Sequence, residues 1–405
     1  MNLSYFISKR ISGKEADGFS GTIHKIAVAS ISIGLAIMII SFLILRGFQE
    51  KIQEKIVSFD GHLQVTKFTL SNSYEEEPIS NAISLLHDYS EYPYIAHVQE
   101  YASKAGLLKA NEEVMGVVLK GVSTSFNLTD FQPHITEGRF PRLDLDTIAN
   151  EILISRKIAD KLSLAVGDNT LLYFIQNPPR VRKLDICGIY ETGMEDFDDK
   201  LIMGDLRLIQ RINNWPDTLV GGVEIFLKDF NRLDKSQEEL EDVVGYELYI
   251  EKVTDKYAEI FDWLALLNRN VVIFLSLTLF VACFNMVSIL LILMMERTQM
   301  IGVLKATGAA NNTIRKIFIY NGMLLITKGL LLGNLIGLMF GFLQGRYQFL
   351  KLDPNNYYME FVPVSWNWTI IIILNLLTFA IVSLSLYIPT TIISRIPPIK
   401  AIRFD

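Results

Sequence analysis

The sequence has few of the residues that build metal sites, disulfide frameworks or nucleotide pockets. Its 405 residues include two cysteines and five histidines. The histidines are scattered without the spacing of metal ligands, and the cysteines are too few for a disulfide framework. No G-x-x-x-x-G-K-[ST] motif is present, so the chain has no Walker A loop to hold nucleotide phosphates. We therefore expect this chain to be non-catalytic, with no cofactor and no metal site.

Long hydrophobic runs are present, but they are unevenly placed. One lies near residues 26–45 and three more lie between residues 271 and 393. Each is long enough to cross the roughly 30 Å hydrocarbon core of a bilayer as a helix. Between the first and second runs, residues 48–268 carry 38 acidic against 22 basic residues, which disfavours nucleic-acid binding. The pattern predicts an α+β membrane protein: four transmembrane helices, with one large domain between the first and second.

Positive charge in the short segments predicts the orientation. Lys and Arg are frequent in residues 1–25, 296–316 and 394–405, whereas residues 345–367 contain only Arg346 and Lys351. The positive-inside rule therefore places both termini in the cytoplasm and the large domain outside. The expected parts are a cytoplasmic N-terminal segment (1–25), a first span (26–47), a periplasmic domain with stalk helices (48–268), a second span (269–295), a cytoplasmic coupling helix and loop (296–316), a third span (317–344), a short periplasmic loop (345–367), a fourth span (368–393) and a cytoplasmic tail (394–405).

The large domain shows a mixed pattern. Strands are predicted at 62–68, 114–119, 151–154, 170–175, 184–189, 223–227 and 246–250, and helices at 79–88, 155–162, 205–211 and 229–242. At its two ends, apolar residues recur at helical spacing and predict stalk helices that pack on each other, with the stripes Phe48, Ile52, Ile56 and Ile260, Leu264, Leu267. If the second stalk runs unbroken from about residue 252 to 296, it is about 65 Å long at 1.5 Å per residue. The acidic residues at 195–199 lack a calcium-loop pattern and are expected to form a solvated turn.

The segment after the second span, ERTQMIGVLKATGAANNTIRKIF, predicts a short helix with an apolar side. One interpretation is a coupling helix that docks on another protein; the alternative is a helix that rests among lipid headgroups. The candidate docking residues are Met300, Ile301, Val303, Leu304, Lys305, Ala306, Gly308 and Ala309.

Two further patterns are candidate contact sites. In the third span, glycines at four-residue spacing form a smooth strip for helix packing: Gly329, Gly333, Gly337, Gly341 and Gly345. Lys328, in the same span, is expected to snorkel to the interface or to lie in an interfacial stretch, and a role in gating is the less favoured alternative. Between two predicted strands, a proline-stiffened hairpin with basic neighbours is either a partner-docking tip or an ordinary solvated hairpin: Ile175, Gln176, Asn177, Pro178, Pro179, Arg180 and Val181.

Three segments carry a resemblance to a known family: ISIGLAIMIISFLILRGFQEKI at 31–52, FNMVSILLILMMERTQMIGVLKATGA at 284–309 and LYIPTTIISRIPPIKAIRFD at 386–405. Through them the chain resembles the FtsX/MacB-type (type VII) ABC transporter permeases, and is most similar to LolC/LolE lipoprotein-releasing transmembrane proteins. It implies a MacB-like periplasmic core domain and a multi-pass inner-membrane protein. The implied function is a permease subunit that extracts lipoproteins from the inner membrane for transfer to the outer membrane.

The resemblance also implies partners. These are two copies of a LolD-like cytoplasmic ATPase, a second permease chain in a homodimer or a LolC/LolE-type heterodimer, lipoprotein substrates and membrane lipid. In LolC a β-hairpin recruits the periplasmic carrier LolA; the matching hairpin here, at 175–181, is shorter. In LolE-like chains the first and second spans receive the lipoprotein. The alternative function is mechanotransmission by a MacB/FtsX-like permease, for efflux or for control of an envelope hydrolase. A sensory receptor is disfavoured because only a dozen residues follow the fourth span.

Overall fold

The computed structural model describes residues 19–69, 76–110, 113–144, 147–245, 247–353 and 357–391. The chain divides into two units. The helical unit comprises Met1–Glu50, Trp263–Lys351 and Phe361–Asp405, and the sheet unit comprises Lys51–Asp262 and Leu352–Glu360. Most of the expected N-terminal segment and all of the expected tail at 394–405 lie outside the described residues.

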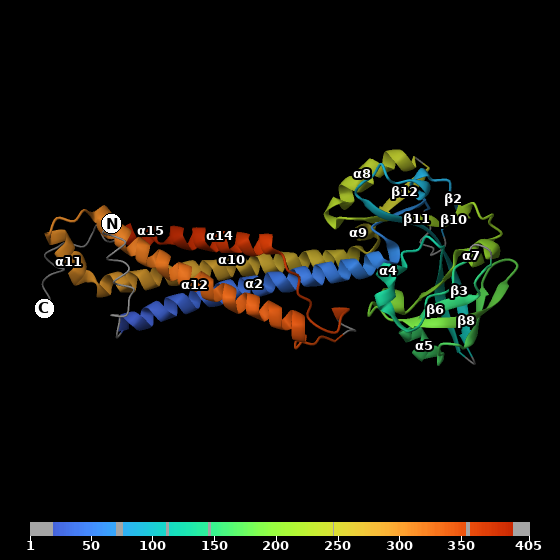
Figure 1. Ribbon diagram of the computed structural model, residues 1–405, viewed down its shortest axis with the longest axis horizontal. Helices are drawn as coiled ribbons and strands as arrows, with labels where there is room; N and C mark the ends of the chain where they lie inside the picture. The colour runs from blue at the N-terminus through green and yellow to red at the C-terminus, as the bar shows by residue number, and fades with distance from the viewer. Residues whose placement is uncertain are drawn as a thin grey trace. The chain divides into compact units, whose positions relative to one another are not determined.

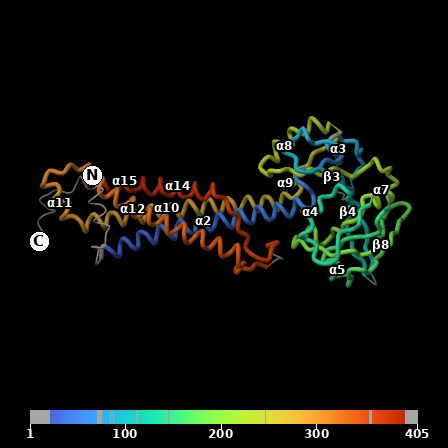
Figure 2. The backbone as a smooth tube through the Cα atoms, viewed as in Figure 1, coloured from blue at the N-terminus to red at the C-terminus, as the bar shows by residue number. Residues whose placement is uncertain are grey.

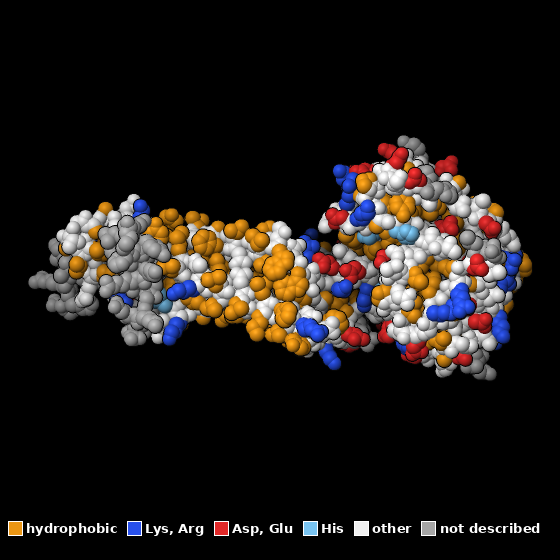
Figure 3. Space-filling view, in the orientation of Figure 1, with side chains coloured by type: hydrophobic (Ala, Val, Ile, Leu, Met, Phe, Trp, Pro, Cys, Tyr) orange, Lys and Arg blue, Asp and Glu red, His pale blue; other side chains and the backbone are white. Residues whose placement is uncertain are grey.

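Within the described part of the helical unit, four helices are long and apolar enough to cross a membrane. They are α2 (Phe19–Asp60), α10 (Ala258–Glu296), α12 (Asn311–Tyr347) and α14 (Trp368–Ser385). Two short helices, α11 (Thr298–Ala306) and α15 (Tyr387–Thr390), follow α10 and α14. Figures 1 and 2 show the long helices running side by side in this unit. Apolar side chains cover much of their surface in Figure 3, as expected for helices that face lipid.

The two stalk predictions have different outcomes. Helix α2 runs without a break to Asp60, which confirms that it continues beyond the predicted span. The second stalk does not run unbroken from residue 252: strand β12 ends at Lys252, a single turn (α9, Val253–Lys256) follows, and Tyr257 breaks the helix with φ −112° and ψ 41°. Helix α10 begins only at the next residue, because the chain leaves the sheet at this point.

The sheet unit is an α+β domain. Its strands are β1 (Leu63–Lys67), β2 (Ile79–Ser80), β3 (Ile95–Ala110), β4 (Glu113–Val122), β5 (Ile135–Gly138), β6 (Glu151–Ser155), β7 (Asn169–Phe174), β8 (Arg180–Tyr190), β9 (Leu201–Asp205), β10 (Leu219–Val220), β11 (Gly222–Leu227) and β12. Its remaining helices are α3 (Ser84–His87), α4 (Leu128–Phe131), α5 (Arg156–Leu162), α6 (Glu195–Asp198), α7 (Leu206–Asn213) and α8 (Leu233–Val244), with 3-10 turns η1 (Gln132–His134) and η2 (Phe230–Arg232).

Among the described residues, ten strands form one mixed sheet. Nine of them follow the order β12-β1-β11-β3-β4-β9-β6-β8-β5, and β7 lies off this path. Strand β7 pairs with both β3 and β8, so β3, β4, β9, β6, β8 and β7 close into a barrel. The strands β12, β1 and β11 extend from β3 as a wing. Strand β3 belongs to both parts, because its first half pairs with β11 and its second half with β7.

The predicted helices at 155–162 and 205–211 correspond to α5 and α7, whose first turns are capped by the side chains of Ser155 and Asp205. The prediction of one helix at 79–88 is wrong: residues 79–80 form β2, which pairs with β10, and only α3 is helical. Strands β2, β3, β5, β9 and β10 were not predicted.

Candidate functional site

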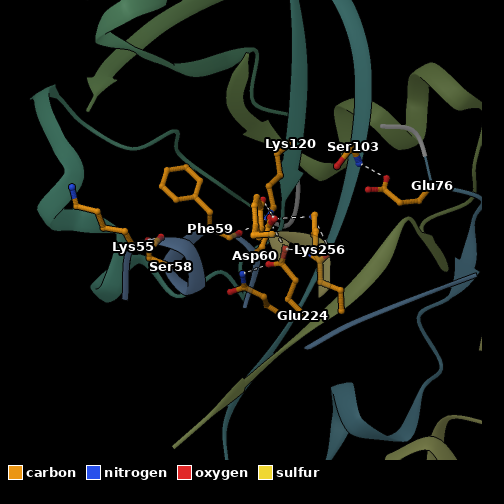
Figure 4. Close-up of polar contacts among 12 residues, drawn as sticks. Lys55, Ser58, Phe59, Asp60, Glu76, Ser103, Lys120, Glu224 and Lys256 are labelled. Carbon is orange, nitrogen blue, oxygen red and sulfur yellow. Dashed lines mark hydrogen bonds and ion pairs between the residues drawn. The ribbon is translucent and has the colours of Figure 1, made fainter. Parts of the chain in front are cut away.

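A buried ionic junction lies where α2 meets the sheet (Figure 4). Asp60 is the last residue of α2, Lys120 lies on β4 and Glu224 lies on β11. The Lys120 ammonium is 2.8 Å from the Asp60 carboxylate and 2.5 Å from that of Glu224. It also donates to the carbonyl of Phe59, so a cation sits at the negative end of the α2 dipole.

The junction also holds the residues that precede α10. Lys256 lies 2.7 Å from the Asp60 carboxylate, and the Tyr257 hydroxyl donates to the same carboxylate. Asp60 therefore connects the end of α2 with the segment immediately before α10. We define the ionic junction as Asp60, Lys120, Glu224, Lys256 and Tyr257.

The charges of this junction are almost fully removed from water. The side chains of Lys120 and Glu224 are 2% and 0% exposed. Burial alone would lower the pKa of Lys120, but the Asp60 and Glu224 carboxylates outweigh it and raise that pKa above its ordinary value. Burial raises the pKa of Glu224, opposed by the Lys120 ammonium. Amides from Gln64 and Gln99 complete the hydrogen bonding of Glu224, at 3.2 and 2.7 Å.

A polar cavity of about 440 Å³ adjoins the junction. Glu76, at its wall, accepts a hydrogen bond from the Ser103 backbone at 2.8 Å, and burial raises its pKa. Both carboxylates and ammonium groups line the cavity, so it has no single sign of charge. Among the described residues, no group of three His, Cys, Asp or Glu side chains is arranged to hold a metal ion.

An apolar groove of about 540 Å³ lies in the helical unit between α2, α10 and α14. Its residues fall on one face of each helix at three- and four-residue spacing. They are Met38, Phe42, Arg46 and Gln49 from α2, Asn268, Val272, Leu275, Ser276 and Leu279 from α10, and Ile370, Ile373, Leu374 and Leu377 from α14.

Polar residues cluster at one end of the groove. Arg46 and Gln49 come from the later part of α2, and Asn268 from the early part of α10. The exposed fractions of Val272 and Ile373 are 51% and 55%, so the groove opens to the surroundings of the helices. Such a site suits an acyl chain with a polar group at one end. The sequence pattern did not reveal it, because these helices are apolar on nearly all sides.

The glycine strip of α12 packs against α2. A Cβ atom added at Gly329 would lie 2.7 Å from Ile31, and one at Gly333 would lie 2.8 Å from the Ser32 carbonyl oxygen. Gly337 and Gly341 make similar approaches to Ile39 and Leu43, whereas a Cβ at Gly345 would meet nothing within 4 Å. The Ser32 hydroxyl also donates to the Gly329 carbonyl at 3.0 Å. Four of the five glycines thus allow two helix backbones to approach closely.

Helix α11 contains most of the predicted coupling residues, but its apolar side faces inward. Ile301 is fully buried in a core with residues of α10 and α12, and Met300, Leu304 and Ala309 pack on the same core. Val303 is 56% exposed, and Ala306 and Gly308 are also exposed. Ile301 is therefore not available for docking, whereas Val303 lies on the exposed side of α11.

The remaining predicted residues are placed separately. In the hairpin between β7 and β8, Ile175 is 78% exposed, whereas the Arg180 guanidinium donates to the Arg211 carbonyl and to the Asn214 side chain at 2.6 and 2.8 Å. Arg180 is therefore held against α7. The stalk residues Ile52, Ile56, Ile260 and Leu264 are buried, and Phe48 and Leu267 are partly buried. Lys328 is exposed on α12.

Comparison with known proteins gives the family. Residues 26–243 match the MacB-like periplasmic core domain, and residues 272–398 match the FtsX-like permease C-terminal family. The chain belongs to the FtsX-like permeases with a MacB-like periplasmic core. Members of this family of ABC permeases are typically non-catalytic transmembrane subunits. The predicted family and fold class are confirmed.

The similarity between this permease and its relatives extends over nearly the full length of the chain. LolE from Haemophilus influenzae is 23% identical over 99% of both chains, and LolC from Neisseria meningitidis is 22% identical over 97% of this chain and 96% of its own. Both are described as lipoprotein-releasing system transmembrane proteins. Among solved structures, the periplasmic region of MacB from Actinobacillus actinomycetemcomitans aligns with a TM-score of 0.35 and 14% identity, over 50% of this chain and 95% of that one.

Proposed function

We propose that this permease extracts lipoproteins from the inner membrane for transfer to the outer membrane. It does so as the transmembrane subunit of an ABC transporter whose ATPase is a separate cytoplasmic chain. Full-length similarity to LolE and LolC supports this function. The single observation that carries it is the apolar groove between α2, α10 and α14, with Arg46, Gln49 and Asn268 at one end.

The groove fits the anchor of a lipoprotein. Acyl chains need an apolar surface, and the polar end of the groove can bind the ester and peptide groups where the chains join the protein. Exposed Val272 and Ile373 leave a lateral opening through which chains can pass from the bilayer. A soluble ligand would not need an opening toward lipid.

Energy input is required because acyl chains leave a bilayer reluctantly. Transfer to water costs about 0.8 kcal/mol per methylene, or about 12 kcal/mol for a chain of about 15 methylenes. Thermal motion does not supply this free energy in one direction, so it gives no net transport. ATP hydrolysis by a partner must therefore drive release. We propose two LolD-like ATPase copies, a second permease chain and, through the hairpin at 175–181, a LolA-like periplasmic carrier.

The proposed topology follows the distribution of positive charge. Both termini and α11 are cytoplasmic, the sheet unit is periplasmic, and the chain resides in the inner membrane. On α11, Val303 and Ala306 lie on the exposed side, where an ATPase can contact them. The ionic junction then holds the periplasmic ends of α2 and α10 to the sheet, so that motion of these helices reaches the strands.

Site-specific photocrosslinking tests the groove. A benzoylphenylalanine at Leu275, inside the groove, should crosslink an acylated lipoprotein in cells, and the yield should fall when ATP turnover is active. The matched control is Leu277, two residues along α10, which is 59% exposed and does not line the groove. Crosslinking of the same lipoprotein at both positions, or of phospholipid alone at Leu275, would refute the proposal. An efflux substrate at Leu275 would favour the MacB-like alternative.

A further inference from the structure

The loop between α12 and α14 is attached to the sheet unit. We call its residues 350–353 and 357–362 the outer loop. The loop closes on itself by a β-bridge between Lys351 and Phe361 and by hydrogen bonds between Leu352 and Glu360, at 2.8 Å, and between Val362 and Leu350, at 3.0 Å. Residues Leu352–Glu360 group with the sheet unit, although α12 and α14 belong to the helical unit.

A lysine of α2 contributes to this attachment. The Lys55 ammonium, on α2, donates to the Tyr358 carbonyl in the outer loop and to the Thr192 carbonyl after β8, both at 2.5 Å. These partners lie 303 and 137 residues away in sequence. Lys55 is half-buried, beyond the predicted span, and burial lowers its pKa although Asp198, Glu360 and Glu191 favour its charged form. Two carbonyl oxygens thus accept hydrogen bonds from the ammonium.

The Thr192 side of the contact is itself fixed. The Asp198 carboxylate accepts hydrogen bonds from the backbone of Thr192 and Gly193 and from the Thr192 hydroxyl, the shortest at 2.8 Å. Asp198 is buried, so the expectation of a solvated turn at 195–199 is wrong for this residue. Gly193 has φ +71°, and a Cβ there would lie 3.4 Å from the Tyr358 carbonyl oxygen. Lys55 therefore binds the outer loop to a rigid turn.

Inside the helical unit, the same helices are already joined. The glycines of α12 pack against α2, and Asn334 and Asn375 exchange hydrogen bonds of 2.6 and 2.9 Å between α12 and α14. Helix α10 is held differently along its length. From Ala282 onward it packs into a core with α2 and α12. Its residues from Asn268 to Leu279 line the groove, and among them only partly buried Leu275 and Leu279 pack on the cores described for this unit.

We propose that Lys55 is a positioning residue that fastens the outer loop to α2, so that α2, α12 and α14 move as one set. The segment of α10 from Asn268 to Leu279 is then the part that moves, and its displacement widens or narrows the groove. The role of the groove rests on the proposed function, but the fastening by Lys55 does not. Loss of the ammonium should release the outer loop while leaving the helices folded.

The test uses the full-length permease with both native cysteines replaced by alanine. Spin labels at Gln53 on α2 and Tyr357 in the outer loop report their separation by pulsed electron resonance. Lys55→Met should at least double the width of the distance distribution, and Lys55→Arg should restore the wild-type width. The matched control is Lys51→Met, one turn earlier, where the lysine is exposed and pairs only with Glu54 at 2.6 Å.

A second measurement separates fastening from transport. In the complex with the ATPase, Lys55→Met should lower lipoprotein release per ATP hydrolysed by about tenfold, with ATPase activity kept. An unchanged distance distribution in Lys55→Met, or equal broadening in Lys51→Met, would overturn the inference. If Lys55→Met broadens the distance distribution but the wild-type complex releases no lipoprotein, the inference holds and the proposed function is refuted.

Discussion

The Lys120 ammonium lies 2.8 Å from the carboxylate that ends helix α2, Asp60. It neutralises two buried carboxylates at once, because Glu224 lies on its other side at 2.5 Å. The end of a membrane-crossing helix is thereby tied to strands β4 and β11 by charge.

Removing the ammonium should destabilise the protein strongly. Lys120→Met leaves two carboxylates buried without their cation, at a cost of about 3–5 kcal/mol. The melting temperature of the full-length chain in detergent should fall by at least about 6 °C. Glu224→Gln, which keeps the Lys120–Asp60 pair, should cost less than Lys120→Met. Equal melting temperatures for Lys120→Met and the wild type would contradict the importance of this junction.

Acid should destabilise the sheet unit through His62. Burial lowers the pKa of His62 to about 4, and its Nδ1 accepts a hydrogen bond from the Leu227 backbone at 3.0 Å. The unfolded chain binds the proton near pH 6.5, so stability is fully present above that pH and declines as the pH falls toward 4. Thermal unfolding between pH 7 and 4 measures this slope.

Variants isolate the histidine contribution. His62→Asn keeps an acceptor near Nδ1 but cannot gain the proton, so its stability should vary less between pH 6.5 and 4. Burial, with Lys55 nearby, also lowers the pKa of His134 to about 4. The double variant His62→Asn, His134→Gln should flatten the curve further. An unchanged pH profile in both variants would show that other groups control acid stability.

The glycine strip offers a matched pair of substitutions. At Gly333 a methyl group would lie 2.8 Å from the Ser32 carbonyl and 2.9 Å from the Leu35 Cβ, so Gly333→Ala should push α12 from α2 at a cost of about 1–3 kcal/mol. At Gly345 the same change meets no atom within 4 Å and should be neutral or slightly stabilising. Melting temperatures of the two variants test this difference. Equal changes in melting temperature in the two variants would contradict close packing at Gly333.

A charge on the exposed side of α11 should weaken binding of the ATPase to the permease. Val303→Asp places a carboxylate on a surface that we propose is covered by the partner, and co-purification should fall by about tenfold or more, equivalent to about 1.4 kcal/mol. The control is Ala310→Asp, an exposed position at the N-cap of α12, where aspartate is favourable. Undiminished co-purification of Val303→Asp would exclude this surface as the contact.

Much of the architecture could be predicted from sequence, because length and hydropathy suffice to identify membrane-crossing helices. Strand β3 was not predicted because its buried residues do not alternate regularly. The pattern is irregular because one end of the strand belongs to the wing and the other end to the barrel. Helix α11 has the apolar periodicity of a docking helix, but periodicity cannot tell an external partner from the protein's own core, where Ile301 is buried.

The two candidate sites depend on long-range contacts that no local pattern reveals. Asp60 and Glu224 are far apart in sequence, and isolated charges are usually exposed to water. Their burial becomes evident only when Lys120 lies between them. Similarly, the groove takes one face from each of three helices, and helices that are apolar on nearly all sides do not reveal which face they share.

ATP-dependent release from proteoliposomes tests the central claim most directly. Vesicles would contain this permease, its partner chain, the separate ATPase and a radiolabelled acylated lipoprotein. We expect ATP to release the lipoprotein into solution or onto a carrier, and groove-filling Leu275→Trp to suppress that release while ATP hydrolysis continues. ATP hydrolysis by the purified permease alone, or retention of the lipoprotein in vesicles despite full ATPase activity, would contradict it.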